Sequence, residues 1–158
     1  MTLKLDFNEV RIMIEAKDIV IEENNTADIY NHGWVGKSVK IFGRDFFKEG
    51  NLGLMVSKEL NIESLPLALN DYLAFLSNCK ELLMDCYREK NSEIINDCFD
   101  GEMTADWYET LEIYGGGIEF DDKGTPSGHF SCGDNMVTDH LLMIEFEHKE
   151  INQMYFEG

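Results

Sequence analysis

Four side chains that zinc enzymes and thiol enzymes commonly use lie close together near the end of the chain: His129, Cys132, Asp139 and His140. Zinc binds imidazole and thiolate ligands, so the spacing of His129 and Cys132 is usable if the chain turns between them. Residues 128–132 have the pattern of a strand, however, and residues three apart on a strand point to opposite faces. We therefore expect no metal and no cofactor. A small hydrolase or metal-dependent enzyme using His129, Cys132 and His140 is kept as the alternative hypothesis.

Aromatic residues beside carboxylates form a second kind of candidate site, whose chemistry is binding rather than catalysis. The candidate contact residues are Tyr30, His32, Trp34, Asp106, Trp107, Tyr108 and Glu109. Tryptophan and tyrosine framed by carboxylates are typical of hot spots that bind surfaces rich in Lys and Arg. Burial in the core is the other common fate of tryptophan, and the sequence leaves both fates open for Trp34 and Trp107. No residue is expected to be catalytic.

The charge of the chain favours the binding hypothesis. Its 31 Asp and Glu outnumber 13 Lys and Arg, which gives a formal net charge of −18 over 158 residues. The acidic residues alternate with apolar ones along the whole chain, so they must coat a folded surface. A field of this sign repels nucleic acid and anionic membranes and attracts basic molecules. The sequence therefore predicts a basic protein partner, with neither nucleic acid nor membrane as a ligand.

Length and composition indicate a single folded domain over residues 1–158. The chain has the usual size of one domain, and 44% of its residues are hydrophobic, which excludes a disordered polyanion. No apolar run reaches the length of a membrane span, and the first residues turn acidic before a signal-peptide core could form. The four cysteines lack the spacing of a disulfide framework and are expected to be buried thiols. We expect a cytoplasmic protein.

The elements that must position these residues follow a strand–helix–strand order. Short β-branched segments predict N-terminal strands at residues 10–15, 18–22, 37–42 and 54–56. Apolar residues at spacings of three and four predict one long central helix over residues 65–89. The last third has the pattern of a meander, with strands at residues 110–120, 128–132, 140–147 and 151–156. This order predicts an α+β fold in which an antiparallel sheet packs against the long helix.

Three short motifs in this order of elements resemble those of small uncharacterised bacterial domains of unknown function. The motifs are GWVGK at residues 33–37, IEFDDKG at 118–124 and DHLLMI at 139–144, and the similarity covers about residues 18–158. The chain departs from the aromatic-Gly-His pattern of such domains, since it has Thr138, Asp139 and His140 there. Members lie singly or near polymorphic-toxin loci, where acidic α+β proteins serve as immunity proteins. The resemblance thus implies an immunity protein, and because such domains have no established catalytic residues, it assigns none to this chain.

Together these observations favour a non-enzymatic acidic binding protein, and specifically an immunity-type inhibitor of a basic, nuclease-like bacterial toxin. Carboxylates would occupy the place of nucleic-acid phosphates on the toxin, and aromatic side chains would supply a dry anchor. Besides the enzyme hypothesis, a third reading is an acidic stand-alone domain whose charge serves only solubility.

Overall fold

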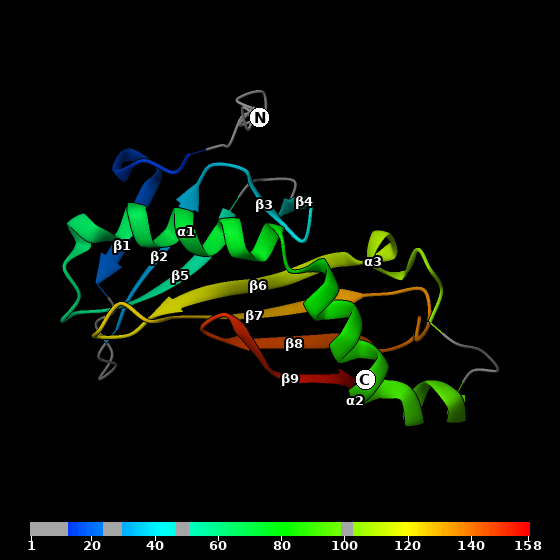
Figure 1. Cartoon of the computed structure of the whole chain (residues 1–158). Helices are drawn as coiled ribbons and strands as arrows, with labels where there is room; N and C mark the ends of the chain where they lie inside the picture. The colour runs from blue at the N-terminus through cyan, green and yellow to red at the C-terminus, as the bar shows by residue number, and fades with distance from the viewer. Residues whose placement is uncertain (1–12, 24–29, 47–50, 99–102) are drawn as a thin grey trace, which may run out of the picture.

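A seven-stranded sheet dominates the computed structural model, which describes residues 13–23, 30–46, 51–98 and 103–158 (Figure 1). Its strands, in order across the sheet, are β1 (Ile19–Glu23), β2 (Tyr30–Gly36), β5 (Asn51–Ser57), β6 (Glu112–Phe120), β7 (Pro126–Gly133), β8 (Leu141–Glu147) and β9 (Glu150–Glu157). Neighbouring strands run antiparallel, except that β5 and β6 are parallel. Helical segments separate β5 from β6 in the chain and return it to the same end of the sheet.

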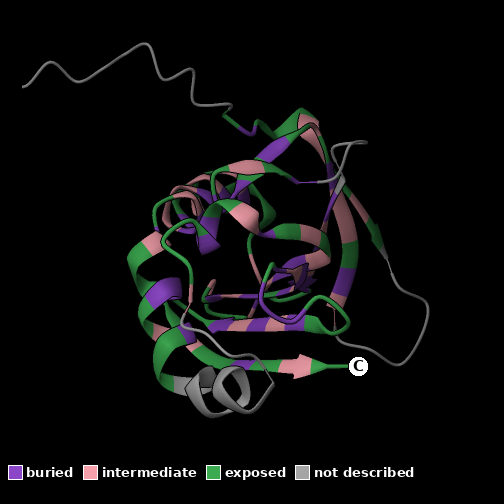
Figure 2. Ribbon diagram, turned by 90° about the vertical axis from the view of Figure 1, so that its right-hand side faces the viewer, coloured by how far each residue is buried: buried purple, intermediate pink, exposed green. Residues whose placement is uncertain are grey.

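The remaining elements lie on one side of this sheet. They are the helices α1 (Leu65–Ser77), α2 (Lys80–Cys98) and α3 (Trp107–Thr110), the short 3-10 turns η1 (Ala16–Asp18) and η2 (Ile62–Ser64), and the hairpin of β3 (Val39–Ile41) and β4 (Arg44–Phe46). In Figures 1 and 2, α1 crosses the N-terminal half of the sheet and α2 lies beside β9. The strands alternate accordingly, and the side chains that face the helices are buried.

Aromatic packing closes the core between the hairpin and the sheet. Phe130 of β7 is fully buried, with its ring centroid 5.2 Å from that of Phe42 and 6.1 Å from that of Phe146. Phe42 and Gly43 form the two-residue turn of the hairpin, with φ values of 54° and 76°. Positive φ at both positions matches the twist of antiparallel strands, so this turn directs the Phe42 ring onto the sheet.

The prediction of one long helix over residues 65–89 is wrong, because the helix breaks between α1 and α2. In a continuous helix the Leu76 carbonyl would accept a hydrogen bond from the backbone N–H of Lys80. It accepts instead from the Phe42 N–H at 3.1 Å and from the Cys79 thiol at 3.3 Å. The hairpin therefore occupies the carbonyl that a continuous helix would need, and the helix is interrupted there.

The mixed α/β character agrees with the prediction, although the sequence predicts no strand at β2 or β4. The expected strands at residues 18–22, 37–42 and 54–56 correspond to β1, β3 and β5, and the C-terminal meander is present as β6 to β9. The expected strand at 10–15 is not found: residues 13–15 are irregular, and residues 10–12 lie outside the described part of the chain. The buried hydrophobic residues form one contiguous cluster.

Candidate functional site

The second face of the sheet carries no helix within the described residues, and we call it the open face (Figure 2). Its central row runs across five strands from Trp34 through Gly53, Gly117 and His129 to Glu145, which are successive partners in the strand register. Side chains at these positions point away from the core because each is one residue from a buried position. The open face therefore gathers aromatic, glycine, histidine and carboxylate groups from distant parts of the chain.

Every charged residue in the seven strands of this sheet is a glutamate. They are Glu22, Glu23, Glu112, Glu119, Glu145, Glu147, Glu150 and Glu157. The ion pairs in the described ranges all join residues outside these strands, such as Lys80 with Glu109 and Lys149 with Asp71. No lysine or arginine of the described chain neutralises the sheet glutamates, so the open face keeps its negative potential.

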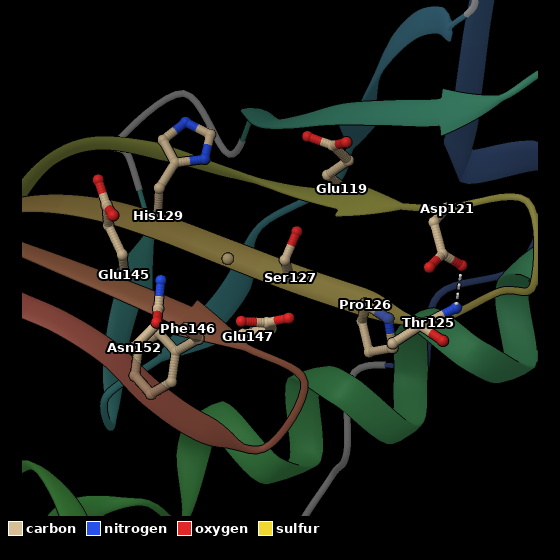
Figure 3. A pocket seen from close by; sticks show the side chains of 11 residues that line it. Glu119, Asp121, Thr125, Pro126, Ser127, His129, Glu145, Phe146, Glu147 and Asn152 are labelled. Atoms are coloured by element: carbon tan, nitrogen blue, oxygen red, sulfur yellow. Dashed lines mark hydrogen bonds between the residues drawn. The ribbon is translucent and has the colours of Figure 1, made fainter.

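A depression of about 410 Å³ lies on the open face where β6, β7 and β8 run side by side (Figure 3). Its polar lining residues are Glu119, Asp121, Thr125, Ser127, His129, Glu145, Glu147 and Asn152. Asp121 is held in place because its Oδ1 accepts the backbone N–H of Lys123 at 2.9 Å and of Thr125 at 2.8 Å. Carboxylates from two strands and one turn thus line the depression together with a single imidazole, His129, which gives it a predominantly acidic lining.

Tyrosine hydroxyls hold several glutamates of this face. Tyr155 donates to Glu145 Oε1 at 3.2 Å, and Tyr114 donates to Glu112 Oε2 at 3.1 Å. Tyr30 hydrogen-bonds to Glu119, whose negative charge is the main reason that the pKa of this tyrosine is raised. The hydrogen bond from Tyr114 to Glu112 raises the pKa of Tyr114 likewise. We call these three the tyrosine–glutamate pairs.

Three of the residues singled out in the sequence lie together on this face. Tyr30, His32 and Trp34 occupy alternate positions of β2, opposite Ser57, Met55 and Gly53 of β5. His32 is exposed, whereas Tyr30 and Trp34 are half-buried. The alternation that suggested a contact segment therefore corresponds to three side chains on one accessible face.

The second predicted contact segment is corrected by the structure, because Trp107 is fully buried and Tyr108 nearly so. Trp107 packs at 4.2 Å from the ring of Tyr87 on α2. Asp106 is exposed, and Glu109 is exposed and paired with Lys80 at 2.8 Å. These two aromatic residues are part of the core, and the segment presents only its carboxylates to solvent.

A buried carboxylate that the sequence analysis did not identify explains the position of Trp107. Asp134 Oδ2 accepts from the Tyr87 hydroxyl at 2.6 Å and from Trp107 Nε1 at 2.9 Å. Its Oδ1 accepts the backbone N–H groups of Met136 and Val137 at 3.2 and 2.9 Å. Burial raises the pKa of Tyr87, and the bond to Asp134 raises it further. The local signal was an aspartate preceding two apolar residues, the pattern of an Asx turn.

The residues of the enzyme hypothesis do not converge. His129 lies exposed on the open face, and Cys132 faces the core, where burial raises the pKa of its thiol to about 12. His140 lies before β8, with its Nδ1 2.8 Å from Asp139. Strand alternation separates His129 from Cys132, as the sequence predicted. In the ranges that the structure describes, no three His, Cys, Asp or Glu side chains are grouped as metal ligands.

Comparison of the chain with protein-family models, with curated proteins and with solved structures finds no match. The class of protein is therefore defined by its own features: an α+β domain with an acidic open sheet face. No helix in the described residues is long and apolar enough to cross a membrane.

Proposed function

We propose that this chain is a non-enzymatic binding protein that acts in the cytoplasm as an immunity-type inhibitor of a basic, nuclease-like toxin. The observation that carries the proposal is the unneutralised charge of the sheet, whose charged residues are all glutamates. A negatively charged surface accelerates association with a basic partner and disfavours acidic partners.

The distribution of groups on the open face supports a protein ligand over a diffuse cloud of counterions. Trp34 and Met55 lie on the same face as the carboxylates, with Met55 opposite Glu119, and both are half-buried, so they offer apolar area that a macromolecule can cover. Aromatic residues within a polar rim are the usual energetic centre of such contacts. Charge alone would serve solubility, whereas charge interspersed with accessible aromatic side chains fits recognition.

Glutamates in strand register also fit the proposed mimicry of nucleic acid. Glu145 and Glu147 lie two residues apart on β8, about 7 Å along the strand, and Glu119 lies on β6. A cleft that binds phosphates would meet a regular row of negative groups here. Occupation of that cleft by the open face would exclude the substrate of the toxin.

The test uses the protein encoded by the adjacent reading frame, purified and mixed with this chain. We expect a stoichiometric complex, loss of the partner's activity, and an association rate that falls at least about tenfold as salt rises from low to physiological levels. A variant in which Glu119, Glu145 and Glu147 are all replaced by Gln should associate more slowly, while Glu81→Gln on α2 serves as the control. A complex whose association rate ignores both salt and these substitutions would contradict the proposal.

A further inference from the structure

The tyrosine–glutamate pairs restrict the carboxylates of the open face. A glutamate side chain on a strand normally samples several rotamers, and ordering it on binding costs free energy. In Glu145 and Glu112 a tyrosine hydroxyl already engages one carboxylate oxygen, at 3.2 and 3.1 Å. The second oxygen remains available to an incoming donor. These carboxylates are therefore pre-oriented acceptors rather than freely moving charges.

Glycines on the open face leave parts of its surface without side chains, among the aromatic and acidic groups. A Cβ built on Gly53 would lie 3.6 Å from its nearest neighbour, the Gly116 carbonyl, and a Cβ on Gly36 would lie 3.7 Å from the Asp18 carbonyl. These are ordinary contacts, so the fold itself does not demand glycine at either position. Glycine inside a strand lowers its stability and often marks a close approach by another molecule.

We propose that the open face is a docking surface for a protein that presents arginine side chains, with guanidinium groups on the tyrosine–glutamate pairs and the depression beside His129. This inference rests on the function proposed above and names the chemistry of the partner and the surface it contacts. Its support is charge complementarity, since the face combines oriented carboxylates with no neutralising cation among the described residues.

Arginine fits this surface better than lysine for two reasons. A guanidinium is a planar fork of donors that matches a carboxylate of fixed orientation, whereas an ammonium is a point charge indifferent to that orientation. A guanidinium also stacks on aromatic faces, and the half-buried Trp34 lies opposite Gly53, which has no side chain. Fixed carboxylates beside an open indole therefore favour arginine.

The test compares two synthetic peptides of about ten residues, long enough to cross the open face. One peptide has arginine at alternate positions with serine between, and the other has lysine in place of arginine. Binding is measured by titration calorimetry at low ionic strength, and amide chemical shifts locate the contact. We expect the arginine peptide to bind about tenfold more tightly, a difference of about 1.4 kcal/mol, with shifts concentrated on β2, β6, β7 and β8.

The matched variants separate orientation from charge. Tyr30→Phe combined with Tyr155→Phe removes two hydroxyls and no charge, and should bring the two peptide affinities to within about threefold of each other. Glu81→Gln, which changes an exposed glutamate on the helical side, should leave the preference intact. Thermal unfolding of each variant establishes that it is folded before its affinity is compared.

Each outcome has a distinct meaning. Equal affinity for both peptides, or shifts confined to α1 and α2, overturns the arginine docking surface and leaves the acidic inhibitor standing. Failure of both peptides to bind at low ionic strength overturns this inference and the proposed function together. An arginine preference that survives in the double tyrosine variant overturns the claim that the pairs of Tyr30 with Glu119 and of Tyr155 with Glu145 create it.

Discussion

Replacing Asp134 with Asn tests the buried hydrogen-bond centre that fixes Trp107 in the core. The change keeps the shape of the side chain but removes its charge and exchanges one acceptor oxygen for an NH2 group. If the remaining oxygen keeps the N–H groups of Met136 and Val137, the NH2 group faces the Trp107 Nε1–H and the Tyr87 hydroxyl, both of which now donate to Asp134. The hydroxyl can reverse and accept, but the indole N–H has no such choice.

The expected loss of stability follows from these contacts. A hydrogen bond to a charged group contributes about 1.5–3 kcal/mol, and a buried donor left without a partner costs about 1–3 kcal/mol. We therefore expect Asp134→Asn to lower the free energy of unfolding by about 2–4 kcal/mol. The measurement is urea unfolding followed by far-ultraviolet circular dichroism, and the exposed Asp139→Asn, with an expected change below about 0.5 kcal/mol, is the control.

A double-mutant cycle isolates the indole contact. In a Trp107→Phe background the orphaned donor no longer exists, so Asp134→Asn should cost at least about 1 kcal/mol less than in the natural chain. Equal costs in the two backgrounds, within about 0.3 kcal/mol, would refute the argument that the bond from Trp107 to Asp134 carries the penalty.

Two further predictions concern buried thiols and the charge around Trp34. Burial raises the pKa of Cys79 and of Cys132 from 9.0 to about 12, so unfolding releases protons above pH 9 and stability should fall as the pH rises from about 9 toward 12. The measurement is the free energy of unfolding in urea at pH 8 and pH 10. The decrease between these two pH values should be smaller in Cys132→Ala, and an identical decrease in that variant would contradict the prediction. Relative to its effect on free tryptophan, caesium should quench the emission more than iodide at low salt, because Trp34 lies on a sheet whose charged residues are all glutamates and Trp107 is inaccessible. The difference should shrink as the screening length drops from about 30 Å at 0.01 M to about 10 Å at 0.1 M salt. Equal relative quenching by both ions at low salt would show that the potential around Trp34 is not negative, and quenching that persists in Trp34→Phe would show that Trp107 is accessible.

Local patterns in the sequence were sufficient for most of the sheet. Short β-branched or apolar segments bounded by turn residues identified strands β1, β3, β5 and β6 to β9. These features depend only on near neighbours in the chain, so they can be predicted from a single sequence. The sequence singled out Tyr30, His32 and Trp34 as a contact segment, but the strand β2 that places them on one face was not predicted.

Features that depend on distant residues were beyond this reasoning. The break between α1 and α2 involves a hydrogen bond from the Phe42 N–H to the Leu76 carbonyl. This contact joins residues far apart in the chain, so the pattern around residue 78 does not predict it. Trp107 and Asp134 are 27 residues apart, so the burial of the indole could not be inferred from its acidic neighbours. Tyr30 and Glu119 likewise meet only after the sheet has formed.

The single parallel pair, β5 with β6, divides the sheet into two halves with different folding requirements. β6 to β9 are joined by short connections, so each pairs with a neighbour in sequence and can form early. β5 meets β6 only after residues 58–111, which include all three described α-helices, have been placed across one face. Closing that long loop costs chain entropy before any pairing repays it. The seam where Gly53 lies beside Gly117 is therefore expected to close late in folding, and the open face does not exist as a continuous surface until it does.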